Sequence, residues 1–272
     1  MKELTIKEIQ NIANDILKYI KTVCDDNGIK FYLAYGTALG AIRHKGFIPW
    51  DDDVDIFMER DEFDKFYSFM KKDQSKYKLL YVNADKNYTL PLPKVIDTTT
   101  EWTQTNVREF MPLGVYVDIF ILDNIPDDKD VREKHFNMLD KKHKLWHFFQ
   151  YKRNYTAKDP ITLLKRLIYK IVNPKIFAKQ LDRIASKYNN DNTSYIGQMT
   201  FVTDPRNMQM FPREWFGDGV VVTFCDTEYL VPKEYDKFLT QCFGDYMTPP
   251  PVSERVSHHT YIAYKKGNSQ IK

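Results

Sequence analysis

Residues 35–56 read YGTALGAIRHKGFIPWDDDVDI, and this stretch indicates both the fold class and the kind of site. Asp51, Asp53 and Asp55 are two residues apart, so on an extended chain their side chains point to the same face. Carboxylates packed this closely repel one another unless cations lie nearby. Hard oxygen ligands of this kind suit Mg²⁺, which also binds substrate phosphates. The segment therefore predicts a strand with one face in a cation-binding site.

A Gly-Thr pair precedes the acidic segment. Residues 31–35 have the apolar and aromatic character of a strand, and Gly36 and Thr37 open a short helix through about Arg43. A strand-to-helix junction offers free backbone N–H groups and a hydroxyl to a phosphate. Two Mg²⁺ ions about 3.5–4 Å apart can clamp the attacking and leaving oxygens of a phosphoryl displacement. The combination predicts phosphate chemistry, with Gly36 and Thr37 in the binding site for the donor.

A two-metal site usually needs a third carboxylate from elsewhere in the fold. Asp118 is an isolated acid in the apolar run at residues 115–122. A buried carboxylate is costly unless it is paired or bound to a metal. We therefore predict Asp118 as the third ligand and as general base for the acceptor hydroxyl; the alternative is an ion pair with a Lys or Arg. Asp123 follows the predicted strand and is expected to cap the next turn.

Basic residues near these acids are candidates for binding the donor. Arg43 and His44 lie between the Gly-Thr pair and the acidic segment, where they can hold a pyrophosphate or the leaving nucleotide monophosphate; the alternative is a solvated surface. Lys94 opens a β-like run and is expected to point into the same cleft. Arg255 and His258 lie in an irregular tail rich in proline, and we expect them to contact phosphate or acceptor.

The periodicity of apolar residues predicts the remaining elements. Helices are predicted over residues 6–23, 36–43, 59–72, 127–151, 160–172, 174–188 and 233–242. Strands are predicted over residues 31–35, 53–58, 77–82, 94–97, 115–122 and 220–224, with an irregular tail from Met247. The fold class is mixed α/β: a catalytic core over residues 1–126, then a mostly helical region over residues 127–272 whose tail returns to the site.

Composition places the chain among ordered globular proteins, with 43% hydrophobic and 28% charged residues among 272. The sequence lacks 18 consecutive apolar residues, and its N-terminus lacks an apolar signal core. These features predict a cytoplasmic protein that can work at the inner face of a membrane. Cys24, Cys225 and Cys242 lie far apart and are expected to be buried free thiols in a reducing compartment.

Positive charge is concentrated in one region. Residues 141–187 hold thirteen Lys or Arg against two Asp, a balance of +11. Within it, residues 161–181 read ITLLKRLIYKIVNPKIFAKQL, an acid-free basic amphipathic segment that predicts peripheral contact with an anionic membrane. The alternative is a helix whose apolar side packs on the core and whose cations face water. A basic block can also face nucleic acid or a polyanionic substrate, but nucleic acid is not expected as a partner here.

Three stretches together resemble the LicD family, whose members include bacterial phosphocholine transferases and, in animals, fukutin-related ribitol-phosphate transferases. They are residues 35–56, the run Val117-Asp118-Ile119-Phe120, and residues 243–250, which read FGDYMTPP. The resemblance implies a nucleotidyltransferase-like core and dependence on Mg²⁺, as one or two ions that Mn²⁺ can replace. It also implies Asp53 and Asp55 as the metal-binding pair, with Asp118 as third carboxylate. The zinc site of the eukaryotic members has no visible Cys or His counterpart.

The leading interpretation is Mg²⁺-dependent transfer of phosphocholine from a CDP-linked donor to a hydroxyl of a cell-surface glycan precursor, free or lipid-linked. The alternatives are polyol-phosphate transfer from a CDP-polyol, nucleotidyl transfer, and a non-catalytic nucleotide-binding module. A choline group would need aromatic faces around its quaternary ammonium. The candidates within or near the motifs are Tyr35, Trp50, Trp102 and Tyr116.

Overall fold

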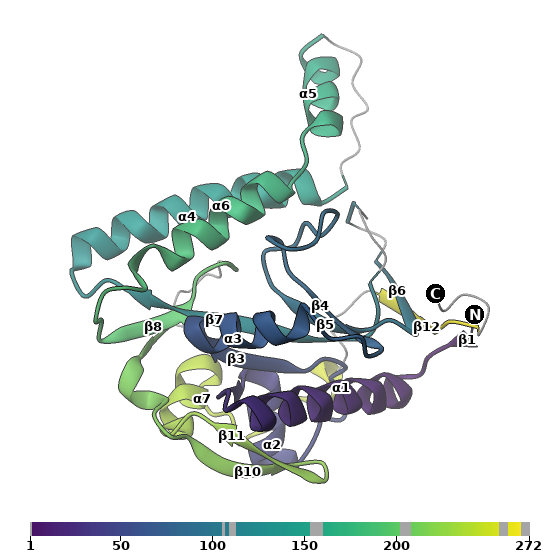
Figure 1. The fold of residues 1–272 in the computed structure, drawn as a ribbon, viewed down its shortest axis with the longest axis vertical. Helices are drawn as coiled ribbons and strands as arrows, with labels where there is room; N and C mark the ends of the chain where they lie inside the picture. Colours follow the sequence, from purple (N-terminus) through teal and green to yellow (C-terminus); the bar gives the residue numbers. More distant parts are fainter. Residues whose placement is uncertain are drawn as a thin grey trace.

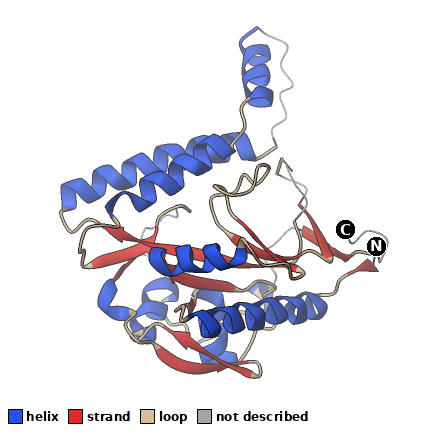
Figure 2. Ribbon diagram, in the orientation of Figure 1, coloured by secondary structure: helices blue, strands red, loops and turns tan. Residues whose placement is uncertain are grey.

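The computed structural model describes residues 2–104, 107–108, 113–152, 160–201, 208–255 and 261–267. It confirms a mixed α/β fold in which helices surround a curled sheet (Figures 1 and 2). The helices are α1 (Ile6–Asn27), α2 (Tyr35–His44), α3 (Arg60–Met70), α4 (Lys129–Gln150), α5 (Pro160–Ile171), α6 (Lys175–Ala185) and α7 (Tyr235–Phe243). The strands are β1 (Lys2–Glu3), β2 (Tyr32–Leu33), β3 (Asp55–Glu59), β4 (Tyr77–Leu80), β5 (Lys94–Asp97), β6 (Thr100–Gln104), β7 (Tyr116–Ile125), β8 (Tyr195–Gln198), β9 (Met210–Pro212), β10 (Val220–Phe224), β11 (Thr227–Val231) and β12 (Tyr261–Lys265).

Local sequence sets the ends of the first helix. Thr5 and Glu8 form a capping box at the start of α1, in which each side chain satisfies a backbone N–H of the other. Gly28 ends the helix in the left-handed conformation with φ 62°, which glycine adopts without strain. The predicted helix is therefore confirmed, although it runs to Asn27 rather than Val23.

The long strand β7 organises the main sheet. In the described residues the strand order is β2-β3-β7-β5-β4, with β8 added to β7 and β9 to β8. β7 runs parallel to β3, while its first half pairs antiparallel with β5 and its last four residues pair antiparallel with β8. Elements from both halves of the sequence therefore meet along one strand.

Aromatic side chains fill the core beside this sheet. Phe57 of β3 has no exposed surface, and its ring lies 4.9 Å from that of Tyr35 and 5.7 Å from that of Phe238, between centroids. The rings of three further residues, Phe120, Phe211 and Phe216, surround it within 6.2 Å. Such edge-to-face packing adds about 0.5–1.5 kcal/mol per pair beyond the area buried. Much of the high aromatic content thus serves the core.

The C-terminal half contains more strand than its periodicity predicts. β8, β9, β11 and β12 carry no clear alternation in the sequence, and each has at most five residues. The tail is not irregular throughout, because β12 pairs with both β1 and β6. The boundary predicted at residue 126 falls directly after β7, and β8 crosses back over it to join the sheet of the first half. Partners so distant in sequence leave no local signal.

Two expectations about single residues are wrong. Asp123 does not cap a turn: β7 continues to Ile125, and Asp123 has no exposed surface. The three thiols are free, but only Cys24 is buried, whereas Cys225 is exposed at the turn between β10 and β11. Within the described residues, the structure has no helix whose length and apolar character would let it span a bilayer.

A buried ionic network ties the helices to the sheet. Arg60 at the start of α3 donates from Nε and Nη2 to the two carboxylate oxygens of Asp123, both at 2.8 Å. Its Nη1 donates to Asp182 of α6 at 3.0 Å. Asp182 also accepts from the Tyr81 hydroxyl at 2.8 Å and from Asn83 at 2.6 Å. The network joins α3, β7 and α6, and so fixes the α4–α6 layer above the sheet (Figure 1).

Replacement of Arg60 should strongly destabilise the protein. In Arg60→Met two buried carboxylates lose their common cation, and breaking a buried pair costs about 3–5 kcal/mol. Urea unfolding followed by circular dichroism measures the loss. The matched control is Lys65→Met, which removes an exposed pair with Glu62 and should cost at most about 1 kcal/mol. Equal stability of the two variants would contradict a structural role for the network.

Candidate active site

Two acids predicted on different strands lie side by side. β3 and β7 are parallel neighbours, and Asp55 is the register partner of Asp118. The backbone holds this register, because the Asp118 N–H donates to the Val54 carbonyl oxygen at 2.8 Å. Paired residues on adjacent strands, about 4.8 Å apart, point to the same face of a sheet. The carboxylates of Asp55 and Asp118 therefore share one face.

The remaining acids of the motif lie on the chain that leads into β3. Asp51 and Asp53 line the same pocket as Asp55, a cavity of about 570 Å³. Asp52 is 8% exposed and is not among the described residues that line this pocket. The expectation that alternate acids share one face is confirmed, although the strand itself begins only at Asp55. The volume suits a ligand the size of a small nucleotide conjugate.

The Gly-Thr pair positions the acids as well as the start of the helix. A Cβ atom on Gly36 would lie 2.9 Å from an Asp51 carboxylate oxygen, so a larger residue would displace that carboxylate. The Thr37 hydroxyl oxygen accepts a hydrogen bond from the Asp55 N–H at 2.8 Å. Gly36 also lines the pocket. Both residues lie at the acidic cluster, and their predicted contact with a donor phosphate stays a prediction.

Tyr35, immediately before this pair, has a strained backbone. Its φ of 36° lies in the left-handed region, which bulky residues rarely adopt. The side chain compensates, because the ring packs against Phe57 and Phe120 and the hydroxyl donates to the Met208 carbonyl oxygen at 2.7 Å. These contacts hold Tyr35, the first residue of α2, in place despite the strain.

The electrostatics of the cluster are unbalanced without a cation. Burial, then the negative charges of Asp53, Asp118 and Asp51, raise the pKa of Asp55 well above its usual range, and Lys94 offsets this only in part. Lys94 is buried and forms an ion pair with Asp118. Of the two outcomes considered for Asp118, the structure shows the ion pair with a lysine, and it also places Asp118 beside Asp55 in register. Its roles as ligand and base stay predictions.

Lys94 also lies on an aromatic platform. It pairs with Asp118 from β5, where it is the register partner of that residue. Lys94 is not among the described residues that line the pocket, so its expected place in the cleft stays a prediction. Its ammonium is 3.5 Å from the ring centroid of Tyr116, and that ring stacks on Trp102 at 4.1 Å with an interplanar angle of 11°. These two aromatic candidates for a choline site therefore already hold a cation of the protein itself.

Basic groups gather at another edge of the pocket. Arg43 lines the pocket and donates from Nη1 to the Tyr246 carbonyl oxygen at 2.6 Å. Burial and the nearby charge of Arg255 lower the pKa of Arg43. Burial and Arg43 likewise lower the pKa of His44, which accepts from Arg43 Nε at 3.0 Å. The Arg255 guanidinium lies 5.4 Å from the ring centroid of Trp50. Arg43, His44 and Arg255 therefore come together, whereas His258 lies outside the described residues.

Several residues that line the pocket give no signal in the sequence. Phe120 reads as one more apolar residue of β7, and Gln198 and Phe201 belong to β8 and the turn after it. Gln198 is buried, and its side chain accepts from the Phe201 N–H at 3.1 Å, which shapes that wall. Phe243 and Tyr246 lie in the motif at residues 243–250, whose place at the pocket the resemblance alone could suggest.

The carboxylates are not yet arranged as a closed metal site. Among the residues that the structure describes, no group of three or more His, Cys, Asp or Glu side chains is placed to hold a metal ion. Asp118 is turned toward Lys94, as its ion pair requires. Asp53, Asp55 and Asp118 stay the predicted ligands. To bind a metal ion, Asp118 would have to give up part of its ion pair with Lys94.

Known proteins match this chain in the motif region and also over nearly its whole length. The family model described as LicD/FKTN/FKRP, nucleotidyltransferase domain, matches residues 28–121. The lipopolysaccharide cholinephosphotransferase LicD of Haemophilus influenzae is 31% identical over 271 residues, which cover 97% of this chain and 99% of that protein. An uncharacterised protein of Rickettsia prowazekii is 30% identical over 156 residues, or 56% of this chain and 52% of that protein.

An acidic pocket with a cluster of cations beside it suits an enzyme that handles phosphorylated groups, and the similarity to a cholinephosphotransferase over nearly the whole chain shows that the protein is a phosphotransferase. The chain belongs to the LicD family, because the similarity to a characterised member extends over nearly the full length of both proteins. The matched region at residues 28–121 contains Asp51, Asp53, Asp55 and Asp118.

The ion pair of Lys94 with Asp118 makes a prediction for stability. Lys94→Met leaves Asp118 buried beside Asp55 without its cation, which should cost about 3–5 kcal/mol. The double variant Lys94→Met/Asp118→Asn removes both charges and should recover more than half of that loss. Urea unfolding in the presence of a chelator measures both. Lys18→Met, which removes an exposed pair with Asp226, is the control. A double variant no more stable than Lys94→Met would contradict the coupling.

Proposed function

We propose that this protein transfers phosphocholine from a CDP-linked donor to a hydroxyl of a cell-surface glycan precursor, in a reaction that depends on Mg²⁺. The full-length similarity to a lipopolysaccharide cholinephosphotransferase supports the group transferred and the class of acceptor. The observation that carries the proposal is the acidic face: Asp55 and Asp118 are paired in register, and Asp55 opens with Asp53 onto a pocket of about 570 Å³.

The donor set fits a hard divalent cation. The side chains of Asp53, Asp55 and Asp118 offer only carboxylate oxygens as ligands. Burial and the repulsion from neighbouring carboxylates raise the pKa of Asp55, and a bound cation would offset that repulsion. These three residues would hold Mg²⁺, as one or two ions. When bound, Mg²⁺ would neutralise charge on the donor phosphates during displacement. Mn²⁺ has a similar preference for oxygen ligands and should replace it.

The basic edge of the pocket suits the pyrophosphate of the donor. Arg43 and Arg255 repel each other in the free protein, so an anion between them would be favoured electrostatically. A guanidinium can bind phosphate oxygens through two parallel hydrogen bonds, which orients the group as well as binding it. Gly36 lies at the start of α2, where backbone N–H groups add to the positive potential. We assign the nucleotide side of the donor to this edge.

Aromatic walls suit the choline end. Trp50, Phe120, Phe201 and Tyr246 line the same pocket as the acids. The face of an aromatic ring attracts a quaternary ammonium by about 0.5–2 kcal/mol. Trp102 and Tyr116 are not among the described residues that line the pocket, and Tyr35, which does line it, is only 8% exposed. The Arg255 guanidinium lies near the Trp50 ring, and a choline group would have to displace it. Of the four candidate rings, we therefore assign Trp50 to the choline subsite.

The acceptor hydroxyl must lose a proton during transfer. Asp118 is the candidate base, because its carboxylate lies beside Asp55 at the acidic cluster and can accept a proton once it is released from Lys94. The choline phosphate would then bond to the acceptor oxygen as the bond to the nucleoside monophosphate breaks. CMP would leave, and the basic edge at Arg43 would hold its phosphate.

Donor and product analysis test the proposal. The protein is incubated with Mg²⁺, an oligosaccharide prepared from lipopolysaccharide, and CDP-choline, CDP-ethanolamine, CDP-glycerol or CDP-ribitol in turn. We expect CMP and a phosphocholine-bearing oligosaccharide from CDP-choline, with much slower turnover of the other donors. Preference for CDP-ribitol or CDP-glycerol would make the enzyme a polyol-phosphate transferase. Nucleotide bound covalently to the acceptor would indicate nucleotidyl transfer, and a rise in Tm with CDP-choline without product would indicate a binding module.

Neutralising single acids tests the site. Asp53→Asn and Asp55→Asn should each lower the transfer rate at least about 100-fold, because charge stabilisation worth several kcal/mol is lost. Neither should lower the Tm of the metal-free protein, since each removes a like charge from the cluster. The matched control is Asp52→Asn in the same segment, which is not among the described residues of the pocket and should keep its activity. Near-normal activity of Asp55→Asn would refute the site.

A further inference from the structure

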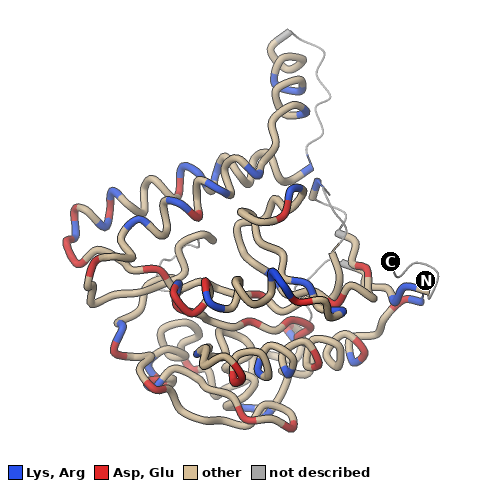
Figure 3. The backbone as a smooth tube through the Cα atoms, viewed as in Figure 1, with Lys and Arg blue, Asp and Glu red and all other residues tan. Residues whose placement is uncertain are grey.

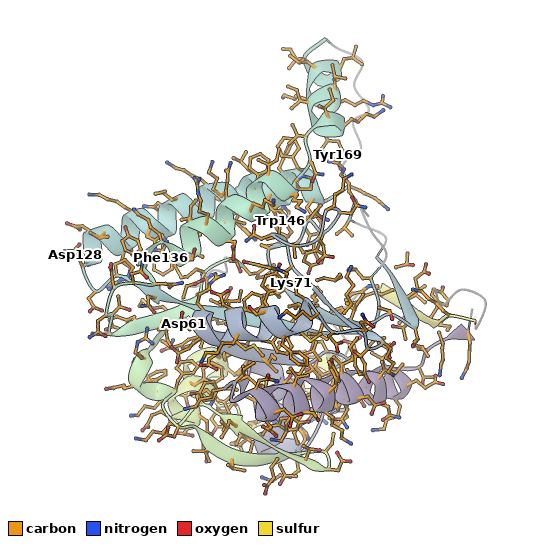
Figure 4. All side chains as sticks on the ribbon, viewed as in Figure 1. Asp61, Lys71, Asp128, Phe136, Trp146 and Tyr169 are labelled. Atoms are coloured by element: carbon orange, nitrogen blue, oxygen red, sulfur yellow. The ribbon has the colours of Figure 1, made fainter. Side chains whose placement is uncertain are left out.

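Helix α5 stands away from the body of the protein with its apolar side chains in solvent (Figures 1 and 4). Its large apolar residues are exposed to a degree that is unusual for a folded helix. They are Ile161 (67%), Leu163 (50%), Leu164 (57%), Leu167 (54%), Ile168 (44%) and Ile171 (72%). A continuous exposed apolar surface of this kind marks a binding site for a protein or a membrane. The alternative considered from sequence, in which the apolar side packs on the core, is therefore wrong for α5, although α6 does bury its Ala178 and Leu181.

One side of α5 is firmly attached. Tyr169 is 9% exposed, and its hydroxyl donates to the Tyr151 carbonyl oxygen at 2.8 Å. Its ring stacks beside Phe149 at the end of α4, with 6.4 Å between centroids. Arg108 donates to the Tyr169 carbonyl oxygen at 2.9 Å. Figure 4 shows Tyr169 where α5 meets the α4–α6 layer. The orientation of the helix is thus fixed by its C-terminal turn.

The apolar residues lie on the opposite side from this attachment. In a helix each residue turns the direction of the side chain by about 100°. Leu164, Leu167 and Ile171 therefore point more than about 120° away from Tyr169 around the helix axis. An ordinary surface helix has its apolar stripe toward the core. In α5 the stripe faces outward.

Positive charge borders the apolar stripe. α5 contains Lys165, Arg166 and Lys170 and has no acidic residue, and all three cations are exposed. Figure 3 shows these cations together with those of the neighbouring α4 and α6. Two copies of α5 would repel each other, so a second copy of this chain is a poor partner. An anionic surface with an apolar interior matches both features of the helix.

We propose that α5 docks this protein on the surface of an anionic lipid bilayer. The outward stripe of Leu164, Leu167 and Ile171 enters the interface between headgroups and acyl chains, and Lys165, Arg166 and Lys170 bind lipid phosphates. α5 has 12 residues, too few to cross a bilayer, so the contact is peripheral. This docking is independent of the transfer reaction, because no described residue of α5 lines the acidic pocket.

Vesicle sedimentation with the full chain tests the docking. Vesicles of phosphatidylcholine alone are compared with vesicles that also contain phosphatidylglycerol. We expect the protein to sediment with the anionic vesicles only and to be released in high salt, which screens the attraction. Equal recovery in the supernatant with both vesicles, or equal sedimentation with both, would overturn the proposal.

Three sets of variants separate the contributions of positive charge and of apolar surface to vesicle binding. Lys165→Gln/Arg166→Gln/Lys170→Gln should lower the partition coefficient about 100-fold, since each cation near the surface contributes about fivefold. The control is Lys7→Gln/Lys71→Gln/Lys72→Gln, which changes the net charge equally at exposed positions outside residues 141–187 and should bind normally. Leu164→Gln/Leu167→Gln/Ile171→Gln should also lose binding. All three should keep the Tm of the parent, because the substituted side chains are exposed.

Two further outcomes would overturn the proposal. Equal loss of binding in the control and in the α5 charge variant would assign the effect to net charge rather than to the helix. Analytical ultracentrifugation tests the second outcome. If the protein does not bind anionic vesicles, and if it forms a dimer that the substitutions of Leu164, Leu167 and Ile171 dissociate, then α5 is a contact between copies of this chain.

Discussion

The register between β3 and β7 sets Asp55 directly beside Asp118, and much of the surrounding structure holds these two like charges together. Unpaired buried carboxylates are costly, so neighbouring groups must compensate. Lys94 supplies a positive charge to Asp118 from the opposite edge of β7. Thr37 accepts a hydrogen bond from the Asp55 N–H, which fixes the backbone of that residue. Asp51, Asp53 and Asp55 line the pocket, where the proposed cation and donor phosphates would bind.

Rigid packing behind the acids keeps this arrangement in place. Tyr35 adopts an unfavourable backbone conformation, and its ring joins the aromatic cluster around Phe57 that compensates for the strain. Asp55 and Phe57 are two residues apart on β3, so their side chains lie on the same face of the strand. Core and site therefore adjoin on one side of the sheet, and Tyr35 and Phe120 of the cluster line the pocket beside the acids. A change in the aromatic packing would move the carboxylates.

The peripheral elements serve a different purpose from the sheet. The buried contacts of Arg60 with Asp123 and Asp182 fasten the α4–α6 layer to β7 and α3. That layer carries α5, whose Tyr169 is bonded to Tyr151 and which presents its apolar side to the surroundings. A firmly attached layer that supports an outward-facing helix is a suitable platform for contact with a surface, while the pocket lies in a separate part of the fold.

The sequence by itself determined the elements near the motif and their chemistry. The two-residue spacing of Asp51, Asp53 and Asp55, the isolation of Asp118 in an apolar run, and the helical spacing of α1 are local properties of the chain. Only the tertiary structure decided that Lys94 pairs with Asp118, that Asp123 binds Arg60, and that β8 supplies a wall of the pocket. It also decided which way the apolar side of α5 faces. Amphipathic periodicity shows that a helix has two faces; contacts between residues far apart in sequence decide which face is buried.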